Sequence, residues 1–306
     1  MTRAKQFPAH GWLGLLLIAI MWPVSWLRVQ PLAEVSFFPL WLGYILTVDG
    51  VVLMRRGSSL LSRNRLAFAG LFLASAPVWW LFEFFNGFIQ NWVYLGAEHY
   101  SQVRYFLQSS ISFSTVAPAV FESAELIASF EFVKRFEGRR AVPASRPVLL
   151  GAFVFGLLSL AAMVMWPRYA FPFTWMCVFF ILDPINYTLG WPSITTWMSR
   201  GDWRPVFALG GGALLCGFFW EMWNFYAWPK WTYHIPFVEF AHIFEMPLLG
   251  YGGYLPFGLE LFAVYHFLRG LAGFAHVQYV RPWPDEVRAE IRDVWEARVE
   301  PEAIRP

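Results

Sequence analysis

Long apolar runs alternate with short polar segments along most of the chain. Each run has about 17–25 residues, the length that crosses a bilayer as an α-helix. Polar and charged residues concentrate between the runs, and those inside the runs are few and widely spaced. The pattern predicts eight membrane-spanning helices, over residues 11–28, 37–54, 66–90, 105–132, 148–166, 172–189, 205–227 and 254–273.

Several polar and aromatic positions occur twice in the same order. Their spacings differ between the two occurrences by no more than one residue at each step, which indicates an internal duplication. We therefore predict four helices per repeat, in a first membrane repeat (1–140) and a second (141–280), followed by a cytoplasmic amphipathic tail (281–306). The recurring set is Glu83, Asn86, Trp92, Tyr94, Pro118 and Glu122, matched by Glu221, Asn224, Trp231, Tyr233, Pro256 and Glu260.

Composition indicates that these helices are surrounded by lipid rather than water. Hydrophobic residues make up 58% of the chain and charged residues 14%, against roughly 45–50% and 25% in soluble globular domains. The expected partner of the helices is therefore membrane lipid. The predicted fold is an all-α polytopic membrane bundle of about eight transmembrane helices in a 4+4 parallel repeat.

The distribution of basic residues orients the bundle. Alternate segments between the runs are rich in Lys and Arg, whereas the intervening segments carry one cation each. By the positive-inside rule both termini are cytoplasmic, as in a bacterial inner-membrane protein. Four spans per repeat make the two repeats parallel. The basic segments contain Arg3 and Lys5; Arg55, Arg56, Arg63 and Arg65; Lys134, Arg135, Arg139, Arg140 and Arg146; and Arg200 and Arg204, against single Arg28, Arg104, Arg168 and Lys230.

The first run resembles the hydrophobic part of a signal peptide. However, its Met21-Trp22-Pro23 recurs as Met165-Trp166-Pro167, so we expect the first run to be retained as part of the first repeat. The two cysteines, Cys177 and Cys216, both fall inside predicted spans and are expected to be packing residues.

Charge and motifs argue against two classes of partner. The net charge of only +2 predicts no nucleic-acid partner. The chain contains neither of the two glycine-rich phosphate loops, GxGxxG and GxxxxGK[ST], so we expect no ATP-driven chemistry.

Carboxylates inside the predicted spans are the candidate catalytic residues. A charged side chain at this depth costs at least ~2.5–3.5 kcal/mol on insertion scales, so it is expected to face the bundle interior or water and to have a partner. Glu83 and Glu221 precede Asn86 and Asn224 by three residues, and each pair shares one helix face. Glu122 and Glu260, the remaining two candidates, each follow a helix-breaking proline by four residues.

Two interpretations of these acids remain open. In one, Glu and Asn form interhelical hydrogen bonds that hold each four-helix unit together and have no chemical role. In the other, both sets converge on a single chamber at the repeat interface, open to the extracytoplasmic side. We favour the second half for proton donation, through Glu221 or Glu260, because it alone carries Lys230 and an insertion rich in polar groups.

The repeated Trp-x-Tyr segments supply candidate substrate-binding residues. Trp92 and Tyr94, and likewise Trp231 and Tyr233, follow the outer ends of the third and seventh runs. Interfacial aromatic belts predict such residues in any membrane protein, which is the alternative interpretation. We group them with Asn86, Asn224 and Lys230 as candidate substrate contacts.

Residues 234–253 form the largest departure from the repeat. Glu239, His242 and Glu245 are three residues apart, so on a helix they would share a face, as in the Glu-x-x-His motif of di-iron bundles. One such motif without its mate is weak support for a metal. We therefore predict no metal site and expect an interfacial or re-entrant segment, which the nearby glycines favour.

The order of the repeated motifs resembles the membrane-spanning lycopene cyclases of the heterodimeric or fused type. The matching segments are Phe82-Glu83 to Trp92-Val93-Tyr94 with Pro118 to Glu122, and Trp220-Glu221 to Trp231-Thr232-Tyr233 with Pro256 to Glu260. They cover about half of each repeat. The chain has Glu in place of that family's Asp and Pro-x-x-x-Glu in place of its Pro-x-Glu-Glu, and it has an additional span in each unit.

The resemblance implies carboxylic acids that protonate a polyene without a redox cofactor. The expected function is then a cofactor-independent acid/base cyclase or isomerase acting on a lipophilic isoprenoid of the carotenoid type. Two other classes fit the same pattern: a proton-coupled transporter, because parallel repeats and midplane carboxylates also occur in carriers, and a non-catalytic membrane scaffold.

Overall fold

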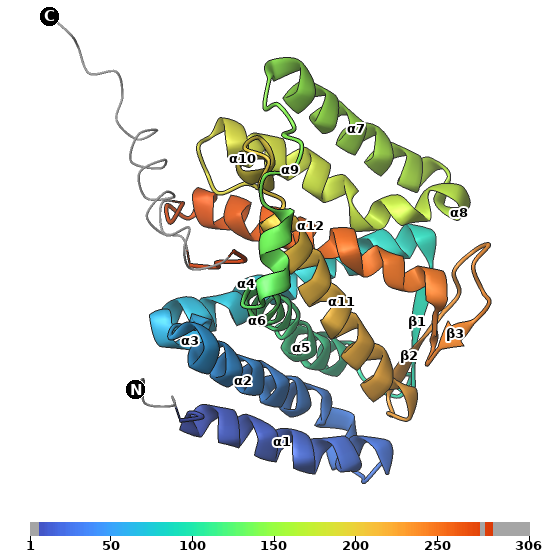
Figure 1. Ribbon diagram of the computed structural model, residues 1–306. Helices are drawn as coiled ribbons and strands as arrows, with labels where there is room; N and C mark the ends of the chain where they lie inside the picture. The colour runs from blue at the N-terminus through green and yellow to red at the C-terminus, as the bar shows by residue number, and fades with distance from the viewer. Residues whose placement is uncertain (1–5, 276–278, 284–306) are drawn as a thin grey trace, which may run out of the picture.

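Helices form most of the described molecule. A computed structural model describes residues 6–275 and 279–283 (Figure 1). Short 3₁₀ helices cover Leu32–Val35 (η1), Glu131–Phe136 (η2), Phe171–Trp175 (η3) and Leu248–Gly253 (η4). The α-helices of this part of the chain are α1 (Ala9–Trp26), α2 (Phe37–Arg56), α3 (Leu60–Arg63), α4 (Arg65–Ile89), α5 (Gln102–Phe113), α6 (Val116–Ala128), α7 (Arg146–Met165), α8 (Pro167–Ala170), α9 (Cys177–Thr188), α10 (Ile194–Met198), α11 (Arg204–Phe225) and α12 (Tyr254–Leu271).

Six helical stretches within the described residues are long and apolar enough to cross a membrane. They are α1, α2, α4, the stretch Gln102–Ala128 that joins α5 to α6, α7 and α11. The predicted helical character is thus confirmed, and the six candidate spans are consistent with a multi-pass membrane protein. The remaining predicted spans coincide with α9, which has only 12 residues, and with α12, which lies outside this set. The count of eight stays a prediction.

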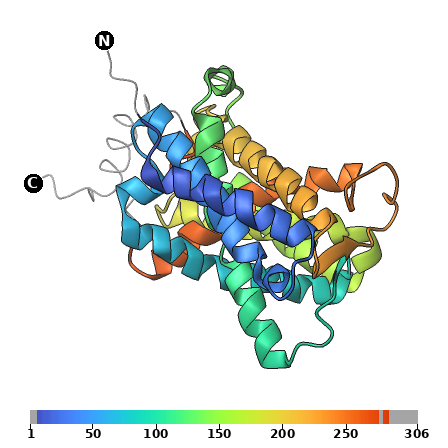
Figure 2. The ribbon, with the colours of Figure 1, turned by 90° about the horizontal axis from the view of Figure 1, so that it is seen from below.

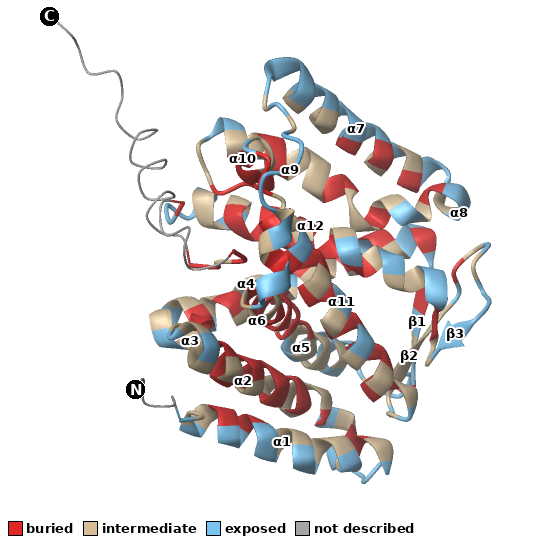
Figure 3. Cartoon of the chain, in the orientation of Figure 1, coloured by how far each residue is buried: buried red, intermediate tan, exposed pale blue. Residues whose placement is uncertain are grey.

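The outermost helices expose apolar side chains. Residues such as Trp12 and Leu16 on α1 and Leu158 and Met165 on α7 are mostly accessible (Figure 3). Figure 2 shows α1 crossing the front of the bundle. Exposed apolar surface on this scale is unfavourable in water and typical of a lipid-facing helix.

Small residues allow the helices to pack closely. A side chain at Gly14 of α1 would lie 2.6 Å from the backbone oxygen of Gly43 in α2. In the centre, a side chain at Gly212 of α11 would lie 2.5 Å from the backbone of Ala124 in α6. Close backbone approach at small residues is the usual packing mode of membrane helices.

A two-stranded antiparallel sheet joins the two halves of the chain at one end of the bundle (Figure 1). Strand β1 (Trp92–Leu95) follows α4, and β2 (Lys230–Tyr233) follows α11. The register places Trp92 opposite Tyr233 and Tyr94 opposite Trp231. The two repeated Trp-x-Tyr segments therefore pair directly with each other.

The segment 234–253 forms a hairpin followed by η4. Strands β3 (His242–Ile243) and β4 (Met246–Pro247) pair antiparallel. The helical face that a shared metal site of Glu239, His242 and Glu245 would require is therefore not formed. Residues 279–283 are described, but the predicted amphipathic helix beyond them lies outside the described residues.

Candidate aromatic chamber

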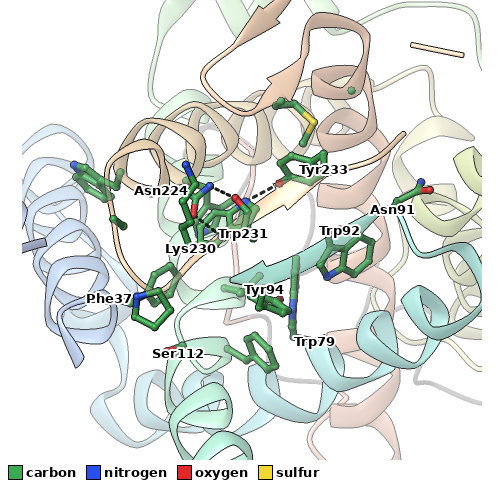
Figure 4. Close-up of a pocket in the computed structure, with 18 of the residues that line it drawn as sticks. Phe37, Trp79, Asn91, Trp92, Tyr94, Ser112, Asn224, Lys230, Trp231 and Tyr233 are labelled. Atoms are coloured by element: carbon green, nitrogen blue, oxygen red, sulfur yellow. Dashed lines mark hydrogen bonds between the residues drawn. The ribbon is translucent and has the colours of Figure 1, made fainter. Parts of the chain in front are cut away.

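A cavity of about 410 Å³ lies beside the β1–β2 sheet (Figure 4). We call it the chamber. It is lined mainly by apolar and aromatic side chains from both halves of the chain. Helices α1, α4 and α11 approach the chamber with their carboxyl ends. Helices α2 and α12 approach it with their amino ends. Its lining includes Trp79, Trp92, Tyr94, Trp231, Tyr233 and Tyr254.

Two asparagines fix the turns that lead into the strands. Asn86 donates to the backbone oxygen of Trp92 at 2.8 Å and accepts from the backbone N–H of Asn91 at 2.9 Å. Asn224 donates to the backbone oxygen of Trp231 at 2.7 Å and accepts from its N–H at 2.8 Å. Each amide side chain therefore pairs with a backbone C=O and a backbone N–H that have left the helical hydrogen-bond pattern at the end of the helix. Asn224 also lines the chamber, whereas Asn86 lies behind it.

Glu83 lies behind the chamber wall. Its Oε1 accepts hydrogen bonds from Trp79 Nε1 at 2.9 Å, Trp92 Nε1 at 3.2 Å and the Tyr94 hydroxyl at 2.6 Å. All three donors line the chamber, but Glu83 itself does not. Three donors on one oxygen stabilise the ionised carboxylate and hold the aromatic side chains in place.

Glu221 has a similar position behind the chamber wall. Its Oε1 accepts from the hydroxyls of Tyr233 and Tyr254, each at 2.7 Å. The Tyr233 hydroxyl in turn accepts from Trp231 Nε1 at 2.9 Å. Oε2 of Glu221 is buried and has no hydrogen-bond partner among the described residues. Glu83 and Glu221 are thus each held through Oε1 by the tyrosine of their own strand, and Oε2 of Glu221 takes no part in these contacts.

The strand tyrosines stay protonated. Burial, reinforced by the neighbouring Glu83 carboxylate, raises the pKa of Tyr94 well above its usual value. Burial and the nearby Glu221 raise the pKa of Tyr233 in the same way. Both phenols are therefore hydrogen-bond donors at neutral pH, and each presents an O–H between a carboxyl group and the chamber.

Two ion pairs flank the chamber. Lys230, which lines it, pairs with Glu245 of the hairpin and donates to the backbone oxygen of Phe225 at 2.9 Å. Glu34 of η1 also lines the chamber and pairs with Arg104 of α5. These contacts attach the η1 and hairpin segments to the helices around the chamber.

Glu260 is placed away from the chamber lining. Its Oε1 accepts from the backbone N–H of Val178 at 2.8 Å, in the first turn of α9. A carboxylate at this position satisfies an unpaired N–H and stabilises the helix dipole, so Glu260 has a structural role in this geometry.

Glu122 is also outside the chamber lining. It is fully buried beside Asp49, nearer the opposite end of the bundle. The structure thus gathers six of the predicted residues in the chamber wall, with Glu83, Asn86 and Glu221 directly behind it. It does not bring Glu122 and Glu260 to the same place. The six are Trp92, Tyr94, Asn224, Lys230, Trp231 and Tyr233.

Tyr254 belongs to the site but was not among the predicted residues. It occupies the position that Val116 holds in the first half, two residues before the repeated proline. A search for recurring residues cannot identify it because the first half has no tyrosine there. The only sequence signal was a phenol at the amino end of a predicted span.

Other polar groups near the hairpin have separate partners. His234 Nδ1 lies 2.6 Å from Glu239, and Glu245 pairs with Lys230. Within the described residues, no group of three or more His, Cys, Asp and Glu side chains is arranged to hold a metal.

Comparison with known proteins adds no relative: no family model, no curated protein and no solved structure matches this chain. The geometry of the chamber therefore carries the functional conclusion.

Proposed function

We propose that the protein is an integral membrane protein built from two duplicated four-helix units, with both termini in the cytoplasm. Matching contacts support the duplication: Asn86 and Asn224 bridge the same turn, and Glu83 and Glu221 each accept from the tyrosine of their own strand. The alternation of basic segments supports the orientation, which puts the chamber at the extracytoplasmic end.

The chamber binds a lipophilic molecule, and Glu221 with its two tyrosines transfers protons to and from it. The observation that carries this proposal is the aromatic cavity shared by both halves, with a carboxyl oxygen of Glu221 left free behind Tyr233 and Tyr254. Apolar, largely aromatic walls favour an apolar ligand. Aromatic faces also stabilise a developing carbocation.

The chemistry that fits is addition and removal of a proton at a carbon–carbon double bond. In the loaded form the protonated Oε1 of Glu221 donates to the Tyr254 oxygen, and the Tyr254 hydroxyl, which otherwise donates to Oε1, turns its O–H towards the substrate. The phenol O–H bond breaks as a C–H bond forms on the substrate, and the Glu221 proton moves to the phenol oxygen. Loss of a proton from a neighbouring carbon reverses both transfers. Nothing is oxidised or reduced, as required of a cyclase or isomerase of polyene isoprenoids.

A substitution that fills the chamber tests the proposal. Gly252 lines the chamber, and a Cβ added there meets no atom within 4 Å. Gly252→Trp should therefore reduce the chamber volume without disturbing the fold. Gly151→Trp is the matched control, because Gly151 is equally open but lies on the exposed face of α7.

Each variant is purified from its native membrane, and the co-purified small molecules are identified by mass spectrometry. We expect an isoprenoid polyene with the wild type and with Gly151→Trp, reduced at least tenfold in Gly252→Trp. Phospholipid alone in all three preparations would contradict ligand binding. A polar solute lost with Gly252→Trp would replace the proposal with a transporter.

A further inference from the structure

A second group of buried acids lies at the end of the bundle opposite the chamber. Asp49 of α2 and Glu122 of α6 both have no accessible surface. Each lies several residues further along its helix than the chamber-lining residues Leu40 and Val116. The chamber chemistry uses neither acid.

Asp49 is fully supplied with hydrogen-bond donors. Its Oδ1 accepts from the Ser59 hydroxyl at 2.9 Å and lies 2.8 Å from His10 Nε2. Its Oδ2 accepts from the backbone N–H of Leu61 at 2.8 Å. These contacts stabilise an ionised carboxylate. The His10 side chain keeps 23% of its surface accessible, whereas its Nε2, the atom that faces Asp49, is buried.

Glu122 has the opposite environment. Neither of its carboxyl oxygens has a hydrogen-bond donor among the described residues, although the side chain is completely buried. Glu125, one turn further along α6, accepts hydrogen bonds from the Arg63 guanidinium and from the backbone N–H of Arg281. A buried charge without a donor is very costly, and in practice such a group becomes neutral. A neutral Glu122 has an O–H of its own. Helix α2 packs directly against α6, where the Tyr44 and Ser123 hydroxyls lie 2.7 Å apart, and Asp49 is the charged group of α2 that acts on Glu122.

We propose that Asp49 and Glu122 form a proton-binding pair, in which Glu122 holds the proton and donates it to Asp49, and that His10 exchanges this proton with the solution. Two carboxyl groups in contact cannot both be ionised in a low-dielectric interior, so they share one proton. Four other titratable groups act on Glu122. They are Tyr44 of α2, Arg63 of α3, Glu125 of α6 and Tyr279 in the segment after α12.

The second half of the chain lacks such a pair. Asp183 follows Phe171-Pro172 as Asp49 follows Phe38-Pro39, and it accepts from the backbone N–H groups of Ile194 and Thr195 at 2.6 and 2.9 Å. Glu260, which matches Glu122, accepts instead from Val178. Two acids that are equivalent in sequence therefore interact in the first half only. This asymmetry indicates a role specific to the first half rather than general helix packing.

Infrared spectroscopy of the full chain tests the pair directly, whatever happens in the chamber. A carboxylic acid and a carboxylate absorb in separate regions of the spectrum. The wild-type minus Glu122→Gln difference spectrum should show the loss of one carboxylic-acid band. Glu125→Gln is the matched control: Glu125 is on the same helix but pairs with arginine, so its difference spectrum should show loss of a carboxylate band.

Loss of a carboxylate band in Glu122→Gln would overturn the proposal. If that variant does not fold, as judged by size-exclusion chromatography, Glu122→Asp replaces it, because it retains an acid at a shifted position. A difference confined to the carboxylate region would then refute a protonated Glu122, whereas a shifted acid band would support it.

The role of His10 has a separate readout. On transfer to D₂O the acid band of Glu122 shifts as its proton is exchanged for a deuteron. His10→Leu should slow this shift at least tenfold, because it removes the partly accessible side chain beside Asp49. An unchanged exchange rate would exclude His10 as the entrance. A chamber that binds no ligand would leave both infrared results unaffected.

Discussion

At the scale of single residues, the buried carboxyl groups differ mainly in their donors. Glu83 collects three donors on one oxygen, and Glu260 accepts from a helix end. Glu221 accepts from two phenols, and its second oxygen has no donor among the described residues. The same residue type at repeated positions therefore has different hydrogen-bond partners.

Replacing Glu221 by a residue that cannot donate a proton should slow the exchange of hydrogen between the bound substrate and the solvent. If the proposed function holds, incubating the purified protein with its co-purified isoprenoid in D₂O incorporates deuterium into the ligand. General acid–base groups contribute roughly 10²–10⁴-fold. We therefore expect incorporation to slow by about 100-fold or more in Glu221→Gln and Tyr254→Phe, measured by mass spectrometry.

Two controls separate this effect from packing. Tyr251→Phe removes a phenol that donates to the backbone of Ile243 and lies outside the chamber. Glu83→Gln removes the matching acid of the first half. Tyr251→Phe should retain normal incorporation, and Glu83→Gln should lower protein abundance more than the rate per bound ligand. Wild-type incorporation in Glu221→Gln would contradict the proton-transfer role.

Glu34 provides a pH-dependent contribution to stability. Burial opposes its ionisation, but hydrogen bonds from Arg104 and Tyr100 outweigh this and lower the pKa of Glu34 below its usual value. Its contribution is therefore complete above the unfolded-state pKa, near 4.3. It is lost as the pH falls through the lower folded-state value. A partly accessible pair of this kind is worth about 0.2–1 kcal/mol.

We expect Glu34→Gln to lower the apparent melting temperature slightly at pH 7. The difference from wild type should shrink as the pH falls below about 4.3, where the wild type also loses the ion pair. Thermal unfolding in detergent across this pH range measures both effects. Glu131→Gln is the control, since Glu131 is 85% exposed and has only its neighbour Lys134 as an ion-pair partner among the described residues. A difference that grows on acidification would refute this explanation.

At the scale of elements, the β1–β2 sheet determines the geometry of the chamber. Val93 lies directly opposite Thr232 in the observed register. Opposed residues in an antiparallel pair have Cβ atoms about 4.5–5.5 Å apart, close to the separation that a disulfide bridges. Oxidation of the Val93→Cys/Thr232→Cys double variant should therefore form a cross-link, detectable as a linked peptide pair by mass spectrometry.

The control for the cross-link shifts the register by two residues. Leu95 lies opposite Lys230, so Leu95→Cys/Thr232→Cys is a diagonal pair with Cβ atoms about 7–8 Å apart. It should cross-link much less. The native cysteines, Cys177 and Cys216, are buried and unpaired, so they contribute little background. Equal cross-linking in both double variants would contradict the register.

The sequence predicted helices better than it predicted strands and breaks. Apolar runs coincide with helices because the lipid interior offers no hydrogen-bond partners to the backbone. Every N–H and C=O in such a run must therefore be paired within the segment, as an α-helix does. The break between α5 and α6 at Ser114 and Thr115 carries no glycine, and β1 is too short for an alternating pattern. Both features depend on contacts with distant segments, which one sequence does not reveal.

At the scale of the whole molecule, the recurring sequence motifs predicted where the two halves meet but not the chemistry of the chamber. Repeated Trp-x-Tyr segments predicted that the two halves would contribute alike, and the pairing of β1 with β2 puts both at one cavity. The depth of each acid was not predictable, because it depends on how far each helix is displaced along its axis. Glu122 and Glu260 consequently occupy separate environments despite their equivalent positions.

The orientation of the bundle is the broadest prediction. If basic segments are cytoplasmic, the loop before α7 is inside, and the loops after β1 and after α7 are outside. Single cysteines at Ala141, Glu98 and Tyr169, which are all exposed, report these three positions. A membrane-impermeant maleimide applied to intact cells should label the cysteines at Glu98 and Tyr169. It should label the cysteine at Ala141 only after the membrane is opened.

The buried Cys177 and Cys216 give the unlabelled background in the parent chain. Labelling at Ala141 in intact cells would invert the topology and place the chamber at the cytoplasmic end. Labelling at Glu98 without Tyr169 would instead mean that α7 does not cross the membrane, even though its apolar side chains are largely accessible. The second outcome would remove the 4+4 repeat, because the second half would then have an odd number of spans and the two halves could not be parallel.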